Sequence, residues 1–241
     1  MWIINLFLIC SIILGFYLGL KPLFMLERLN KFVLLNTSLI VFAVFTLLMI
    51  LYVFGLFPQS VAAPFMMVIY STLAGFFGGY GVRLIRIRSE GGKLLYQHRS
   101  FWIDHAPNLL AVVLILFGLY RTAILTDQAV TGIRVTSGLS LIGFGFLIWT
   151  LKVVPEFRSA GILLLDRLIQ WDEVLAWKWA GENVIAIEYL VQRSEDNERI
   201  REFLTSIPED EKKQLEAILS SKMDEFADSR SEKLFKESDQ T

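Results

Sequence analysis

Two histidines and a nearby aspartate are the residues whose types could bind a metal ion or carry out acid–base chemistry: His98, Asp104 and His105. Imidazole and carboxylate groups are common zinc ligands, and a suitably placed pair of them can also transfer a proton. No recognised ligand spacing surrounds these residues, and Asp104 and His105, as sequence neighbours, point apart on a helix. We therefore predict neither a metal site nor a catalytic site at this position.

Other signatures of catalysis are missing from the sequence of 241 residues. It has no HExxH, P-loop or GxSxG motif, and its single cysteine excludes an internal disulfide and a cysteine-rich metal site. The carboxylates at 172–173, 195–196 and 209–211 are sequence neighbours and lack the separated acid and base of a glycoside hydrolase. We predict that the protein is not an enzyme and holds no cofactor.

A cluster of basic residues is the most distinctive polar feature: Arg83, Arg86, Arg88, Lys93 and Arg99. Two of these arginines alternate with isoleucines, and Gly91-Gly92 follows, a pattern that predicts a short β-hairpin. Such cations either mark the cytoplasmic side of a membrane or bind anionic lipid headgroups, at about 1 kcal/mol for each cation. Contact with an acidic part of the same chain is a third interpretation.

The charges divide sharply along the chain. Residues 1–155 hold 11 basic and 4 acidic residues, whereas residues 156–241 hold 12 basic and 20 acidic residues. The overall net charge of −1 is therefore a cancellation between a basic part and an acidic part. With 54% hydrophobic residues, the composition indicates a membrane protein with a water-exposed C-terminal domain.

Five stretches are long and apolar enough to cross a membrane as helices, which takes about 20 residues. They are residues 2–20, 32–57, 61–82, 106–125 and 135–154. No acidic residue lies in any of them, which argues against an ion-coupled transporter. We predict an all-α membrane bundle of five transmembrane helices within residues 1–155.

Loop charges predict how these helices are oriented. The loops at 21–31 and 83–105 are rich in lysine and arginine, and the loop at 58–64 has no charge. Because basic loops stay in the cytoplasm, we expect a multi-pass protein of the plasma membrane, such as the bacterial inner membrane. Its N-terminus would lie outside and its C-terminus in the cytoplasm.

Glycines recur at a spacing of four residues in two of the predicted helices. They are Gly15 and Gly19 in the first, and Gly75 and Gly79 in the third. Small residues at this spacing allow two helix backbones to approach closely. We expect them to pack helices within one bundle, with a pore, a hinge or a homodimer contact as the alternatives.

Beyond Pro155 the pattern changes to short strands. Strands are predicted at 161–165, 168–171, 175–179 and 184–191, with a fifth at 199–204. A capping box at Ser206–Glu209 predicts the start of an amphipathic helix that extends to Phe226. Trp171, Trp177 and Trp179 are expected in the core of this domain rather than in a ligand pocket, because a small sheet needs large buried side chains.

Four features of this region carry a resemblance: Gly161-Ile162, Ile169-x-Trp171-x-Glu173-Val174, Trp177-x-Trp179, and the 184–191 strand with its terminal helix. Together they resemble the abbreviated PH-like domains that follow membrane helices in bacterial multi-span proteins of unknown function. The resemblance covers about residues 158–226. It implies an α+β fold, an antiparallel sheet of four to five strands closed by one C-terminal helix.

We thus expect a membrane domain at 1–155, a PH-like domain at 156–227 and a polar, disordered tail at 228–241. The leading functional hypothesis is a non-catalytic membrane protein whose cytoplasmic domain binds another protein or the basic loops of its own chain. The alternative is a small transporter or lipid-handling protein built on the glycine-rich helices. The bilayer, anionic headgroups and a second copy of the chain are possible partners, and nothing in the sequence predicts a nucleic acid.

Overall fold

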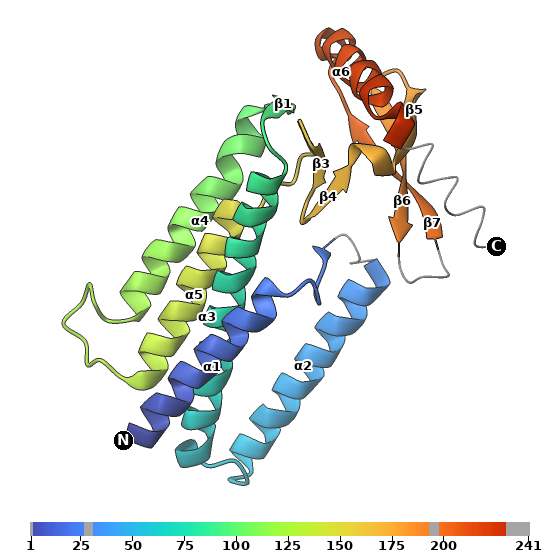
Figure 1. Ribbon diagram of the computed structural model, residues 1–241. Helices are drawn as coiled ribbons and strands as arrows, with labels where there is room; N and C mark the ends of the chain where they lie inside the picture. The colour runs from blue at the N-terminus through green and yellow to red at the C-terminus, as the bar shows by residue number, and fades with distance from the viewer. Residues whose placement is uncertain (1, 27–30, 193–197, 230–241) are drawn as a thin grey trace. The chain divides into compact units, whose positions relative to one another are not determined.

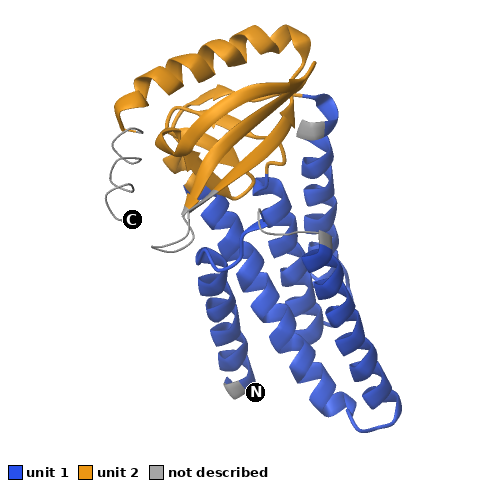
Figure 2. Ribbon diagram, turned by 90° about the vertical axis from the view of Figure 1, so that its right-hand side faces the viewer, with its two compact units in different colours: residues 1–86, 100–151 blue, residues 87–99, 152–241 orange. Residues whose placement is uncertain are grey.

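The computed structural model describes residues 2–26, 31–192 and 198–229. The chain forms two compact units, which we call the helical unit and the sheet unit (Figure 1; Figure 2). The helical unit comprises residues 1–86 and 100–151, and the sheet unit comprises 87–99 and 152–241. Two separate stretches of sequence therefore build the sheet unit, and the chain passes between the units three times.

The helical unit is made of long apolar helices joined by short connections. Their bounds are α1 (Trp2–Leu20), α2 (Lys31–Val53), α3 (Gln59–Glu90), α4 (Phe101–Arg121) and α5 (Gly132–Thr150). Each of the five predicted apolar stretches is helical over most of its length. The second ends earlier than predicted, at Val53, before a turn at Gly55, whose φ of 72° lies in the left-handed region.

Up to three helices have the length and composition to cross a membrane. Among the described residues these are Phe32–Val53, Gln59–Glu90 and Gly132–Thr150. Two shorter apolar stretches, Ile4–Leu20 and His105–Arg121, lie in α1 and α4. The protein thus has helices suited to membrane association, as its composition predicts.

Glycines bring α1 and α3 into backbone contact. A methyl group on Gly15 would clash with the carbonyl oxygen of Thr72, and one on Gly75 would clash with that of Ile12. Gly19 and Gly79 face backbone atoms of the opposite helix in the same way. The glycine pairs predicted from sequence therefore lie face to face, and a larger residue at any of these positions would force the helices apart.

The sheet unit contains two antiparallel sheets. The first has the order β1-β2-β3-β4, with β1 (Leu94–Tyr96), β2 (Glu156–Arg158), β3 (Gly161–Leu164) and β4 (Arg167–Gln170). The second has the order β5-β6-β7, with β5 (Val174–Gly181), β6 (Val184–Gln192) and β7 (Glu198–Ser206). Five strands lie where the sequence predicts them, but they divide between two sheets and do not form the one sheet that was predicted. The first sheet also gains β1 and β2, which were not predicted to pair.

One hydrophobic core joins the two sheets and the C-terminal helix α6 (Lys212–Glu225). Trp171, Ile187, Leu215 and Leu219 are fully buried in it. The helix begins later than the sequence predicts, because Ser206 ends β7 and a 3-10 turn at Glu209–Glu211 precedes α6. The predicted capping box at Ser206 is therefore wrong: the strand ladder already uses this residue.

The predicted hairpin at residues 83–99 is wrong in its first half. Residues 83–90 are the last turns of α3, because this stretch contains no glycine or proline that would end the helix before Gly91. Gly92, with φ of 72°, then ends the helix in the left-handed conformation that glycine adopts without strain. Leu94–Tyr96 is a strand, but it pairs with β2, so residues 87–99 fold with the sheet unit and not with the helices around them.

Candidate functional site

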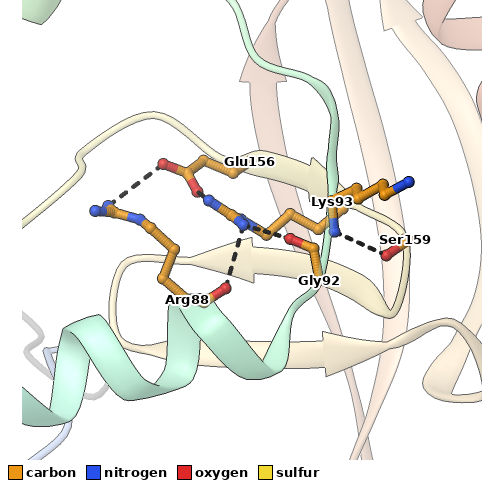
Figure 3. A network of polar contacts seen from close by, with 6 residues as sticks. Arg88, Gly92, Lys93, Glu156 and Ser159 are labelled. Carbon is orange, nitrogen blue, oxygen red and sulfur yellow. Dashed lines mark hydrogen bonds and ion pairs between the residues drawn. The ribbon is translucent and has the colours of Figure 1, made fainter.

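Residues 87–99, which we call the inserted segment, complete the edge of the first sheet. Tyr96 of β1 lies opposite Phe157 of β2 in an antiparallel pair. The backbone N–H of Lys93 donates to Oγ of Ser159 at 3.0 Å (Figure 3). The N–H of Ser159 donates to the carbonyl of Lys93 at 2.8 Å. This segment, which lies between two apolar helices in the sequence, is therefore a structural part of the C-terminal domain.

Arg158 caps the C-terminal end of α3. Its Nη1 donates to the carbonyl oxygens of Arg88 at 3.1 Å and Gly92 at 2.7 Å (Figure 3). The last carbonyls of a helix have no partner within it and carry partial negative charge, so a guanidinium group there is favourable. A methyl group on Gly91 would lie 2.7 Å from Cδ of Arg158, so this glycine leaves room for the arginine.

Glu156 is buried between two arginines. Its Oε2 accepts hydrogen bonds from Nε and Nη2 of Arg158 at 2.7 and 2.6 Å, and its Oε1 lies 3.3 Å from Nη2 of Arg88. Only 3% of the Glu156 side chain is exposed, against 11% for Arg158. A two-pronged pair with a second cation provides the charge neutralisation that a buried carboxylate needs.

A second cluster joins the inserted segment to the start of α6. The phenol of Tyr96 donates to Oε2 of Glu211, and Nδ1 of His98 lies 3.2 Å from the same oxygen. Burial raises the pKa of the Tyr96 phenol, and the hydrogen bond and charge of Glu211 raise it further. The phenol thus stays protonated and continues to donate its hydrogen bond well into the alkaline range.

An open groove of about 310 Å³ lies beside this cluster. It is lined by Leu94, Leu95, Tyr96, Gln97, Arg99, Glu211 and Gln214. Its donors and acceptors come from the inserted segment and from the helix. Among these lining residues no nucleophile is paired with a base.

The five predicted cations do not form one surface. Arg83 is buried in the helical unit and donates to the carbonyl of Phe24 at 3.0 Å, and Arg88 pairs with Glu156. Arg86, Lys93 and Arg99 are exposed. Arg83 and Arg88 are thus engaged with the protein itself, and Arg88 pairs with a residue of the acidic C-terminal part.

The three tryptophans lie in or against the core of the sheet unit. Trp171 is fully buried, and its indole N–H donates to the carbonyl of Arg158 at 3.0 Å. Trp177 and Trp179 are partly buried and pack against the core, and Trp179 donates to Glu216 of α6 at 2.7 Å. These contacts are the packing roles expected of large side chains in a small domain.

The two histidines, His98 and His105, have different partners. His98 contacts Glu211, whereas the ring of His105 packs on Phe101 with centroids 4.7 Å apart. The side chain of Asp104 lies outside the described part of the chain. Among the described residues, no group of three or more His, Cys, Asp or Glu side chains is placed to hold a metal ion.

Sequence reasoning missed Tyr96, Glu156, Arg158 and Glu211, the residues that fix the inserted segment. One signal was available for Glu156, because it is the first acidic residue after the last apolar helix and follows a proline. A charge at such a junction is costly unless it is exposed or paired. Of its two partners, Arg158 is two residues away, but Arg88 belongs to a distant stretch of the sequence, so no local pattern identifies the cluster.

Residues 153–224 match the family described as a domain of unknown function, DUF5673. No curated protein and no solved structure matches the chain. The family match covers β2 to most of α6, and the inserted segment lies outside it. The chain is similar over this stretch to a family whose activity is not known, so the functional argument depends on the geometry.

Proposed function

We propose that the protein is a non-catalytic, five-span membrane protein whose sheet unit is a PH-like domain that binds a protein partner in the cytoplasm. The observation that carries the proposal is the buried Arg88–Glu156–Arg158 cluster, which ties the inserted segment to the C-terminal domain. Because α3, α4 and α5 all lead directly into this unit, the unit that would bind the partner has three covalent connections to the helices.

Five spans and a cytoplasmic C-terminus are part of the same proposal. At 1.5 Å per residue, the 19 residues of α1 and the 21 residues of α4 extend roughly 30 Å, about the thickness of the hydrocarbon core. The basic loops supply the expected charge bias. Reporter fusions at Gln59 and Asp228 test it: we expect opposite sides of the membrane, outside and inside, and the same side for both would contradict five spans.

The interaction requires a test on the full chain. A C-terminal fragment such as 158–226 lacks Glu156 and β1, so it would miss part of its own first sheet. We therefore propose chemical cross-linking of the tagged full chain in its native membrane, followed by identification of the cross-linked peptides. A different protein cross-linked to residues 156–227 is the expected result.

Matched variants connect that result to the site. Glu156→Ala should lose the cross-link, because two arginines are left without their buried carboxylate. Glu182→Ala changes the same residue type at an exposed turn between β5 and β6 and should keep it. Cross-links confined to copies of this chain in every sample would contradict a role in binding a different protein.

Transport or lipid handling by the glycine-rich helices is the alternative function. The backbone contact between α1 and α3 accounts for Gly15, Gly19, Gly75 and Gly79 by helix packing. This contact favours a structural role for the four glycines. Flux in reconstituted vesicles that depends on Gly75 and Gly79, in variants that remain folded, would favour the transporter instead.

A further inference from the structure

The groove beside Tyr96 has groups of opposite charge on its two sides. Arg99, at the end of the inserted segment, contributes a guanidinium group, and Glu211, just before α6, contributes a carboxylate. Among the described residues no ion pair joins these two side chains, so both charges remain available in the groove. Its volume of about 310 Å³ is large enough for a small ligand. A ligand with one positive and one negative group would find a counter-charge on each side.

Glu211 is fixed through only one of its two carboxylate oxygens. The phenol of Tyr96 donates to its Oε2, and Nδ1 of His98 lies 3.2 Å from the same atom. Within the described residues no hydrogen bond uses Oε1, and 29% of the side chain is exposed. The charge of Asp210, together with that of Glu211, raises the pKa of the Tyr96 phenol, so this side of the groove is anionic. An ammonium group suits this side, because it donates charge-assisted hydrogen bonds to a carboxylate.

Arg99 gives the other side of the groove the chemistry of an anion site. Its side chain is exposed, and within the described part of the chain no hydrogen bond or ion pair engages it. A guanidinium group binds phosphate or carboxylate oxygens through two parallel N–H donors. The amides of Gln97 and Gln214 line the same groove and add donors for further oxygens.

The sequence places Arg99 next to the start of an apolar helix. Only Ser100 separates it from Phe101, where α4 begins, so the Cα atoms of Arg99 and Phe101 are at most about 7.6 Å apart. Phe101 and Trp102 are 68% and 74% exposed, and their rings contact each other edge to face. Exposed aromatic side chains at the end of an apolar helix are typical of the membrane interface, the layer of the lipid phosphates. In the proposed five-span topology, on which this inference rests, α4 begins at that layer, so the Arg99 side chain reaches lipid phosphates.

We propose that the groove binds the headgroup of a phospholipid that carries a primary ammonium group, phosphatidylethanolamine. Its phosphate pairs with Arg99, and its ammonium group donates to Oε1 of Glu211. Phosphatidylcholine has a quaternary ammonium group without an N–H donor, and phosphatidylglycerol has no cation to face Glu211. Loss of a hydrogen bond to a charged group weakens binding about tenfold, so we expect the groove to prefer phosphatidylethanolamine by that factor.

Alkylation of a cysteine in the groove measures its occupancy in the full chain. Cys10 is the only cysteine of the sequence, so the background is C10S and Gln97→Cys is added. A maleimide should react with the thiol at position 97 about tenfold more slowly in nanodiscs that contain phosphatidylethanolamine than in nanodiscs of phosphatidylcholine, with or without phosphatidylglycerol. Ala180→Cys, exposed on β5 of the second sheet, should react equally fast in all three lipid mixtures.

Free O-phosphoethanolamine distinguishes the lipid from a soluble ligand with the same two charges. Added to phosphatidylcholine nanodiscs, it should protect position 97 less than phosphatidylethanolamine does, because the bilayer holds the lipid headgroup beside Arg99. Full protection by the free compound and none by the lipid would overturn a membrane lipid as the ligand. Reporter fusions test the five-span topology separately, so a failure of the lipid site and a failure of the topology are distinguishable.

Matched variants connect the protection to the two charged groups. Arg99→Gln and Glu211→Gln should each abolish the difference between the lipids. Lys93→Gln and Glu209→Gln remove the same charges at exposed positions outside the groove lining and should keep the difference. Arg99 is exposed, so its substitution should not alter folding. The proposal is overturned if the three lipid mixtures give equal rates, or if the preference persists in Arg99→Gln and Glu211→Gln.

Discussion

At the scale of single residues, the decisive group is a buried carboxylate with two cationic partners. Glu156 is almost fully enclosed, whereas Arg88 and Arg158 keep part of their surface in water. Removing one partner of a buried ion pair leaves an uncompensated charge, which costs more than the pair itself contributes. The cluster is therefore a sensitive point of the sheet unit.

Glu156→Gln should lower the free energy of unfolding of the sheet unit by about 3 kcal/mol, because both arginines lose their counter-charge. Urea unfolding followed by tryptophan fluorescence measures it, since Trp171, Trp177 and Trp179 all lie in this unit. Glu182→Gln, at an exposed turn, should change the free energy by no more than about 0.5 kcal/mol. Equal losses in the two variants would contradict the role of Glu156.

The raised pKa of the Tyr96 phenol predicts that the sheet unit loses stability at alkaline pH. Its pKa in the folded state is raised above its ordinary value of 10.0, first by burial and then by Glu211. The contribution of the Tyr96 phenol to the free energy of unfolding is therefore fully present below pH 10. It is lost as the pH rises above 10, because the phenol loses its proton in the unfolded chain at a lower pH than in the folded protein. Tyr96→Phe should unfold with a weaker dependence on pH above 10, and an unchanged dependence would contradict this assignment.

At the scale of elements, the turn that ends α3 directs the following residues of the inserted segment toward β2. Gly92 has φ of 72°, and Ser159 occupies the space that a side chain at this position would need. Gly55 has the same φ with no atom nearby, so the two glycines differ only in their surroundings.

Gly92→Ala should therefore destabilise the protein by more than the backbone strain of about 1–2 kcal/mol that any such residue pays. Gly55→Ala should show that strain alone. Thermal unfolding of the two variants in the same detergent compares them, and a smaller effect at Gly92 would contradict the tight contact with Ser159.

The same elements show what sequence can predict. Apolar length identifies the helices, and alternation with turn residues identifies β3 to β7, because both signals are local. The three-residue strand β1 pairs with β2 through contacts of Glu156, Arg158 and Ser159. These residues are distant from β1 in the sequence, so no local pattern reveals the pairing. The hairpin prediction was wrong because residues 83–90, where two arginines alternate with isoleucines, continue the helix α3.

At the scale of the whole molecule, the basic and acidic parts of the chain meet in the sheet unit. The Arg88–Glu156 pair is one such contact. The division of charge along the sequence is therefore partly explained by ion pairing between the two parts within the sheet unit. Lys93 and Arg99 are exposed at the surface.

The measurement that tests the central claim most directly is an intramolecular disulfide between the inserted segment and β2–β3. Lys93→Cys and Ser159→Cys, combined in the C10S background, place thiols on residues whose backbones are hydrogen-bonded at 2.8 Å. Oxidation of membranes that contain this full chain should produce an internally cross-linked monomer, seen as a mobility shift that reductant reverses. Free thiols at both positions after oxidation, with each accessible to alkylation, would contradict the inserted segment as part of the C-terminal domain.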